Sequence, residues 1–230
     1  MDQIKSAPKA TGILLFLLLL NILNMVDRTL ITSFGSAIIK DLNLSDSQFG
    51  LLTGPIFVFF YSIMGLFMGA LADRVHRPRL IAAGLLLWSA LTAVSGMAKN
   101  FVQIGVARLF IGVGESAMTP SAISMISDLF PKARRGTATG IYYLGVPLGA
   151  GGSFIVAGIL GPMIGWRNCF FLLGGVGVVL ALGLLFLKDP KRGAMEDKED
   201  SMAPEQEEAL LGGDWRRVIS DVLLVVRSTR

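Results

Sequence analysis

Ionisable side chains inside apolar segments are the residues of this sequence most able to do chemistry. Residues 11–34 form a long apolar run that nevertheless contains Asn24, Asp27 and Arg28. At about 100° per residue, these three side chains and Asn21 fall on one stripe of a helix built otherwise from Leu, Ile and Phe. An ionised group in lipid costs at least about 2.5 kcal/mol, so the stripe must face protein or water. The open alternative is an Asp27–Arg28 pair near the helix end that snorkels to the membrane surface.

A second apolar run, residues 102–126, repeats this pattern. Arg108, Gly112 and Glu115 are spaced by four and three residues, so the cation and the acid share one helix face about two turns apart. Pro120 predicts a break or a kink in the helix, because proline has no N–H to donate. Arg108 and Glu115 could lock helices together, or Glu115 could load and release a proton beside a movable arginine.

A third cluster lies in the loop within GLFMGALADRVHRPR, residues 65–79. Asp73 is followed by three cations within six residues, Arg74, Arg77 and Arg79. A tight cationic loop between two apolar runs indicates a membrane hairpin whose turn is cytoplasmic. Gly65 and Gly69 lie four residues apart on one helix face, a spacing that lets another helix approach closely.

Composition places most of this chain in lipid. Of its 230 residues, 53% are hydrophobic and 17% charged, and the mean hydropathy is +0.63. The net charge of +4 does not predict nucleic-acid binding, because the cations lie in short loops between apolar runs. The single cysteine, Cys169, offers neither a disulfide nor a metal pair. We find no nucleophile–base pair, metal-ligand set or phosphate loop, and so predict no enzymatic activity, metal or cofactor.

Six apolar runs are each near the length needed to cross a hydrocarbon core of about 30 Å. They cover residues 11–34, 49–71, 80–98, 102–126, 137–160 and 169–187. Ser45 and Gln48, just before the second run, have the spacing of a capping box and predict its helix start. The fold class predicted is therefore an all-α polytopic membrane protein with six transmembrane helices.

The distribution of cations predicts the orientation of these helices. Eleven cations lie on one side of the predicted bundle: Lys5, Lys9, Arg74, Arg77, Arg79, Lys132, Arg134, Arg135, Lys188, Lys191 and Arg192. The other side has three, Lys40, Lys99 and Arg167. By the positive-inside rule both termini are cytoplasmic, and we expect an integral multi-pass protein of the plasma (inner) membrane.

The chain divides into four predicted parts. Residues 1–10 form a cytoplasmic leader, and residues 11–187 form the six-helix bundle. Residues 188–213 read as an acidic cytoplasmic linker, and residues 214–230 as a short amphipathic helix or the start of a second half. The first and fourth helices both carry charges away from their starts, as expected if two three-helix repeats surround a cavity.

Two of these motifs resemble those of a known family. The stretch Gly69-Ala-Leu-Ala-Asp73-Arg74-Val-His-Arg77 is similar to the signature loop between helices two and three of the major facilitator superfamily. The stretch Arg108-Leu-Phe-Ile-Gly112-Val-Gly114-Glu115 is similar to its helix-four motif. The resemblance covers about residues 11–192 and implies one half, the amino-terminal six helices, of a major facilitator fold.

Within that superfamily the chain most resembles the spinster-like branch. The matching stretches are Asn24–Arg28, Trp88–Ser89, Gly114–Glu115 with Pro120, and Asp128–Pro131. The resemblance implies a proton-coupled transporter of lysolipid or sphingolipid-like amphiphiles. It implies a proton and substrate site, in which Asp27 and Glu115 carry protons, Arg28 binds an anionic headgroup or senses charge, Arg108 organises its helix, and Asn24 belongs to the same site. It also implies a cytoplasmic conformational latch made of Asp73, Arg74, Arg77 and Gly69.

Other functions stay open from the sequence. The organic-anion/proton symporter branch shares the Asp-Arg pattern of the first helix. A full transporter has about twelve helices, so we expect a truncated or partial chain, or alternatively a half-length scaffold or regulator that does not transport. The partners expected are a small amphiphilic or anionic substrate, membrane lipid, and a second six-helix half or a homologous chain. The proton is the expected coupling ion, and nucleic acid is not a partner.

Overall fold

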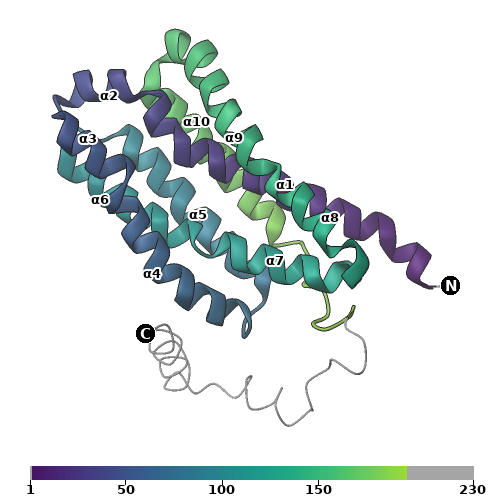
Figure 1. The fold of residues 1–230 in the computed structure, drawn as a ribbon. Coiled ribbons are helices and arrows are strands. Elements are labelled where there is room, and N and C mark those ends of the chain that lie inside the picture. Colours follow the sequence, from purple (N-terminus) through teal and green to yellow (C-terminus); the bar gives the residue numbers. More distant parts are fainter. Residues whose placement is uncertain (1, 196–230) are drawn as a thin grey trace.

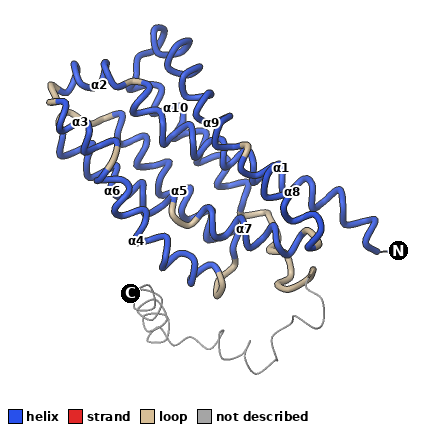
Figure 2. The backbone as a smooth tube through the Cα atoms, in the orientation of Figure 1, coloured by secondary structure: helices blue, strands red, loops and turns tan. Residues whose placement is uncertain are grey.

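The described part of this protein is entirely helical. The structure, a computed structural model, describes the backbone of residues 2–195 and the side chains from residue 9 onward. Within that range it contains helices packed side by side and no strand, which confirms the predicted all-α class (Figures 1 and 2). The predicted amphipathic helix at 214–230 and most of the predicted acidic linker lie outside the described residues.

The helices follow one another with short connections. In chain order they are α1 (Asp2–Ser33), α2 (Gly35–Leu42), α3 (Asp46–Thr53), α4 (Pro55–Ala72), α5 (Arg77–Gly96), α6 (Phe101–Glu115), α7 (Met118–Leu129), α8 (Lys132–Tyr143), α9 (Gly145–Ile155), a π-helical stretch η1 (Val156–Leu160), and α10 (Gly161–Leu184). Helix α1 already begins at Asp2, before the apolar run that starts near residue 11. Hydropathy marks the segment that suits lipid, whereas backbone hydrogen bonding can begin earlier.

Five helical segments are long and apolar enough to span a membrane: Lys9–Ser33, Asp46–Ala72, Arg77–Gly96, Phe101–Leu129 and Lys132–Leu184. The last segment has 53 residues. As one continuous helix it would be about 80 Å long, well over twice the thickness of the hydrocarbon core. It breaks at Gly165, whose φ of 78° and ψ of 161° are not helical, and the chain turns back there (Figure 1). Counted as two crossings, this segment gives the six that the sequence predicted.

Proline positions explain breaks within single spans. Helix α6 ends at Glu115 and α7 begins at Met118, so the break predicted from Pro120 is confirmed. Pro120 has no N–H for the carbonyl of Ser116, four residues earlier, and the preceding turn gives way. Pro147 stands in the same relation to the break between α8 and α9.

Other local predictions have different outcomes. The capping box is confirmed, since the Gln48 backbone N–H donates to Ser45 Oγ at 3.2 Å and the Ser45 N–H donates to Gln48 Oε1 at 3.0 Å. The close helix approach predicted at Gly65 and Gly69 is not found within the described residues. A Cβ added at either glycine would meet no atom within 4 Å.

Other glycines do bring helices into contact. A Cβ at Gly84 of α5 would lie 2.5 Å from the carbonyl oxygen of Gly114 on α6. A Cβ at Gly149 of α9 would lie 2.5 Å from both the carbonyl oxygen of Ile22 and Cβ of Met25 on α1. These close approaches hold α1 against α9 and α5 against α6.

One end of the bundle is closed by a polar cluster around Arg167. Its guanidinium donates to Asp41 Oδ2 in the last turn of α2, to the carbonyl of Gly96 at the end of α5, and to the carbonyl of Ala98 just after it. Trp166 Nε1 also donates to Asp41 Oδ2, at 3.0 Å. Arg167, predicted to lie on the outer side, therefore joins α10 to the ends of α2 and α5.

Candidate functional site

An ion pair between α1 and α6 forms the centre of the candidate site. Arg28 donates from Nε and Nη2 to Glu115 Oε2, at 3.0 and 2.8 Å. The Arg28 side chain is 26% exposed, whereas that of Glu115 is fully buried. The two donors make a charge-assisted contact with one carboxylate oxygen. An anion that competes with Glu115 for Arg28 can approach through the exposed part of the arginine.

Arg108 supports the backbone beneath this pair. Its Nη2 donates to the backbone carbonyl of Arg28 at 3.2 Å, and the residue is 2% exposed. The guanidinium carbon of Arg108 lies 4.9 Å from the ring centroid of Phe57 on α4. The Arg28 guanidinium carbon lies 4.8 Å from the same ring and 4.4 Å from that of Tyr61. Two aromatic faces on α4 therefore help to hold both cations in a sparsely hydrated place.

The other side of the α1 stripe contacts α5 and α8. Asp27 is 4% exposed, and its Oδ2 accepts a hydrogen bond of 2.6 Å from the Thr92 hydroxyl. Asn21 Nδ2 donates to the carbonyl of Tyr142 at 2.8 Å, close to the break between α8 and α9. The predicted stripe thus faces protein, and Asp27 is not the exposed member of a snorkelling pair.

Several polar atoms in this core have no hydrogen-bond partner among the described residues. They are Asn24 Nδ2, Arg108 Nε and Glu115 Oε1, each in a residue that is 3% exposed or less. A buried polar group without a partner costs roughly 1–3 kcal/mol, so such groups mark a place where a ligand or a proton can add a bond. The free Oε1 of Glu115 is the most informative of them.

The structure therefore brings together Asp27, Arg28, Arg108 and Glu115, and it buries Asn24 on the same face of α1. Their roles in proton coupling and substrate binding stay predictions. Sequence reasoning missed Thr92, Phe57 and Tyr61 as partners. The i, i+4 spacing of the two aromatic residues on α4 was a usable signal, whereas nothing in the sequence paired Thr92 with Asp27.

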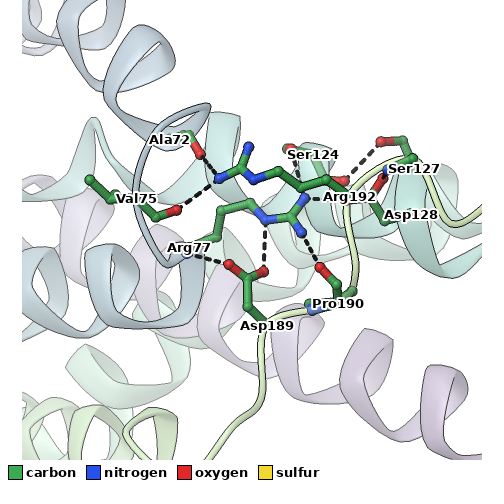
Figure 3. Close-up of polar contacts among 10 residues, drawn as sticks. Ala72, Val75, Arg77, Ser124, Ser127, Asp128, Asp189, Pro190 and Arg192 are labelled. Carbon is green, nitrogen blue, oxygen red and sulfur yellow. Dashed lines mark hydrogen bonds and ion pairs between the residues drawn. The ribbon is translucent and has the colours of Figure 1, made fainter. Parts of the chain in front are cut away.

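A second polar cluster lies where α5 begins, around fully buried Arg77 (Figure 3). Its guanidinium forms ion pairs with Asp128 of α7 and with Asp189, the latter at 2.8 Å. It also donates to Ser124 Oγ at 2.9 Å and to the carbonyl of Pro190 at 2.6 Å. One arginine therefore joins α5, α7 and the segment after α10.

The segment after α10 also contacts the end of α4. Arg192 donates to the carbonyls of Ala72 and Val75, both at 2.8 Å, and the Gly193 N–H donates to Asp128 Oδ1 at 2.9 Å (Figure 3). The predicted latch residues differ in environment. Arg77 is at the centre of this cluster, while the side chain of exposed Asp73 makes no hydrogen bond or ion pair with any described residue.

The remaining predicted latch residues also stand apart. Arg74 makes no side-chain hydrogen bond or ion pair within the described range, and Gly69 faces open space. Sequence reasoning did not assign Asp128, Asp189 or Arg192 to this cluster. The alternation of acid and base in Asp189-Pro-Lys-Arg192 was its available signal.

Comparison with known proteins agrees with this geometry. The sequence matches the profile of the Major Facilitator Superfamily over residues 17–228. The chain belongs to this superfamily. It is therefore an integral multi-pass membrane protein of a transporter family, with helices of the lengths described above.

Individual relatives refine the family assignment. The chain is 32% identical to human protein spinster homolog 1 over 186 residues, which cover 79% of this chain and 35% of that protein. It is 30% identical to an MFS-type efflux pump of Mycolicibacterium smegmatis, covering 91% and 48%, and 30% identical to a probable L-galactonate transporter of Escherichia coli, covering 77% and 39%. The chain thus spans about half or less of the length of these relatives.

A solved structure gives the same result. The crystal structure of a bacterial homologue of the human lysosomal transporter spinster, inward-facing and unoccupied, aligns with a TM-score of 0.74 at 34% identity. The alignment covers 86% of this chain and 47% of that one. Within the superfamily the chain is similar to the spinster-like branch, as the sequence motifs predicted.

Proposed function

We propose that this chain forms the amino-terminal half of a proton-coupled secondary transporter that moves an anionic amphiphile, lysolipid or sphingolipid-like, by alternating access. The observation that carries the proposal is the ion pair between partly exposed Arg28 and fully buried Glu115. A partly exposed cation paired with a buried acid can couple the binding of an anionic substrate at Arg28 to the protonation of Glu115.

The coupling follows from competition for one guanidinium. A proton on Glu115 removes the charge that holds Arg28, and the freed arginine can then bind the phosphate or carboxylate of a substrate. Binding of the anion to Arg28 in turn favours the protonated acid, because coupling between two sites is reciprocal. The atom available to the proton is Glu115 Oε1, which has no partner among the described residues.

Asp27 is a second candidate proton carrier. It lies next to Arg28 in the chain, and among the described residues the donor to its carboxylate is a neutral hydroxyl, that of Thr92. Arg108 takes the role of an organiser, because it donates to the backbone of Arg28 rather than to either acid. Asn24 contributes an unpartnered amide on the same face.

Alternating access requires a second six-helix half, supplied by further sequence or by another chain. The exposed apolar face of α4 and the open surface at Gly65 and Gly69 support such docking. We place the Arg77 cluster and both termini on the cytoplasmic side of a plasma (inner) membrane, in accord with the cation distribution. The latch would then act on that side.

A small organic anion is the second candidate substrate. Similarity to a protein named a probable L-galactonate transporter favours it, and an arginine site suits a carboxylate as well as a phosphate. The aromatic faces of Phe57 and Tyr61 beside Arg28 favour the amphiphile, because they offer apolar contact next to the charge. Competition between a lysophospholipid and a sugar acid in one flux assay separates the two.

The test is Glu115→Gln in the protein completed by its second half. We expect proton-driven flux to be lost while the amount of folded protein is unchanged, because glutamine keeps the shape and hydrogen bonding but does not ionise. Asp46→Asn, which neutralises an exposed carboxylate at the start of α3, should leave flux and its pH dependence as they are. Flux through Glu115→Gln with the pH dependence of the parent protein would rule Glu115 out as the carrier.

A further inference from the structure

A groove lies between the start of α1 and the end of α10, away from the central site. It has a volume of about 450 Å³ and is lined by one face of α1, with Lys9, Gly12, Ile13 and Phe16, and by the segment from Gly183 to Lys188. That volume is within the range of about 300–1,000 Å³ typical of small-molecule sites. The residues of α1 are spaced by three, one and three, as one helix face requires.

The groove is open because its floor has glycines where side chains would otherwise fill it. A Cβ at Gly12 would meet no atom within 4 Å, and a Cβ at Gly183 would meet only Phe16 Cζ, at 3.6 Å. Phe16 and Phe186 form apolar walls, and Phe186 is 88% exposed. Within the described residues no other part of the chain covers this apolar surface.

Two lysines lie at the groove's membrane-surface end. Lys9 begins the first membrane span, and Lys188 follows the end of α10 by four residues. Both are exposed, and neither ammonium group has a hydrogen bond or ion pair within the described range. The acid next to Lys188, Asp189, does not neutralise it, because both Asp189 oxygens accept from Arg77.

We infer that this groove binds an anionic phospholipid from the membrane leaflet in which α1 begins. The two lysines match the phosphate at headgroup level, and the glycine floor with its aromatic walls takes an acyl chain below it. Basic pockets between transmembrane helices are known to bind such headgroups. A docked protein surface would need partners for both lysines and a complementary ridge, whereas the lipid supplies the charge and the tail together.

The test is lipid retention by the 230-residue chain in detergent, measured by native mass spectrometry with phosphatidylglycerol or phosphatidylcholine added. We expect phosphatidylglycerol to be retained at least about 10-fold more tightly. The double variant Lys9→Gln/Lys188→Gln should weaken its binding about 10- to 30-fold, because each lysine near a charged lipid surface contributes about 1 kcal/mol. The charge-matched control Lys40→Gln/Lys99→Gln changes two exposed lysines that we assign to the opposite surface and should bind as the parent does.

Gly12→Leu tests the apolar end separately. A Cβ at Gly12, which lines the groove, would meet no atom within 4 Å, and a leucine there would occupy acyl-chain space, so we expect phosphatidylglycerol retention to fall at least about 5-fold with both lysines in place. Equal retention of the two lipids by the parent chain would overturn the proposal. So would unchanged phosphatidylglycerol binding in Gly12→Leu or in Lys9→Gln/Lys188→Gln. An equal loss of binding in the control Lys40→Gln/Lys99→Gln would also overturn it. Because the two variants act on different ends of the groove, either alone decides the outcome, and neither depends on transport.

Discussion

At the scale of single residues, the central site is asymmetric. Both Arg28 donors converge on one oxygen of Glu115, and the other oxygen has no described partner. Arg28 is partly exposed, so an anion can reach it when Glu115 is neutral, and a proton on Glu115 and an anion on Arg28 would be linked events. This asymmetry favours our proposal of a site that exchanges ligands over a purely structural salt bridge.

Thr92 is the residue through which Asp27 can be tested. Thr92→Val keeps the shape of the side chain and removes the hydroxyl that donates to Asp27 Oδ2 at 2.6 Å. We expect the free energy of unfolding of the chain in mixed micelles to fall by about 1.5–3 kcal/mol, the usual value of a hydrogen bond to a charged group. In an Asp27→Asn background the same change should cost less, because the charge is gone.

The matched control for Thr92 is Thr53→Val. Among the described residues the Thr53 hydroxyl donates to carbonyls of its own helix, those of Phe49 and Gly50. Its loss should therefore lower the free energy of unfolding by much less than the loss of the Thr92 hydroxyl. Equal costs at the two positions would contradict a specific role for the contact between Thr92 and Asp27.

Part of this site could be predicted from the sequence. Asp27, Arg28, Arg108 and Glu115 stand out because a charge inside an apolar run needs a partner. The partner of Asp27 could not be predicted, because Thr92 lies on another helix and a neutral hydroxyl carries no signal in an apolar run. Periodicity within one helix identifies the face that is buried, but not which residues of a neighbouring helix it meets.

At the scale of helices, the contact of α1 with α9 depends on a glycine. Gly149→Ala places a Cβ 2.5 Å from the Ile22 carbonyl oxygen and from Met25 Cβ, so the two helices must separate. We expect a loss of about 1–3 kcal/mol in the free energy of unfolding, the usual cost of overpacking a core. Thermal unfolding of the purified chain measures it as a lower Tm.

Gly151 provides the control within the same helix. A Cβ there would meet no atom within 4 Å, and Gly→Ala in a helix interior favours folding by about 0.5–1 kcal/mol. Gly151→Ala should therefore keep or raise the Tm. A Tm loss at Gly151 as large as that at Gly149 would show that the effect does not come from the α1–α9 contact.

The two ends of the basic loop lead to opposite predictions. Arg77→Gln leaves Asp128 and Asp189 without their cation and should cost about 3–5 kcal/mol, because Arg77 is fully buried. Asp73→Ala should change stability by less than about 0.5 kcal/mol, because its exposed side chain has no partner among the described residues. Chemical denaturation of each variant in micelles measures its free energy of unfolding.

In the completed transporter we expect Asp73→Ala to slow conformational exchange more than it weakens substrate affinity, as a latch residue should. Exchange is measured by the rate at which a cysteine label becomes accessible from each side. A defect confined to affinity would count against the latch, and a large stability loss in Asp73→Ala would contradict its exposed position.

The helices were largely predictable, their connections less so. Apolar length predicted the crossings, Pro120 the break in the fourth, and Ser45 with Gln48 a helix start. Gly65 and Gly69 were expected to meet another helix, but in this chain they face open space, because the spacing of small residues does not specify which partner approaches. The Arg77 cluster draws on α7 and on the segment after α10, a grouping that only the tertiary structure reveals.

At the scale of the whole molecule, the chain resembles half of a transporter. It matches relatives over about half or less of their length, and many large apolar side chains on its outer faces are exposed. Lipid covers part of that surface, and we propose that a second six-helix bundle covers the rest. The alternative, a half-length scaffold or regulator, predicts a stable complex with a full-length relative and no flux of its own.

The most direct test of the central claim is flux in proteoliposomes under a pH gradient. A lysophospholipid and a sugar acid serve as substrates. The chain is reconstituted alone, together with a matching second half, and as its Glu115→Gln variant together with the same second half. We predict flux driven by the gradient only when both halves are present and Glu115 is intact. Gradient-driven flux that persists in Glu115→Gln, or no flux from the two halves together, would contradict the account.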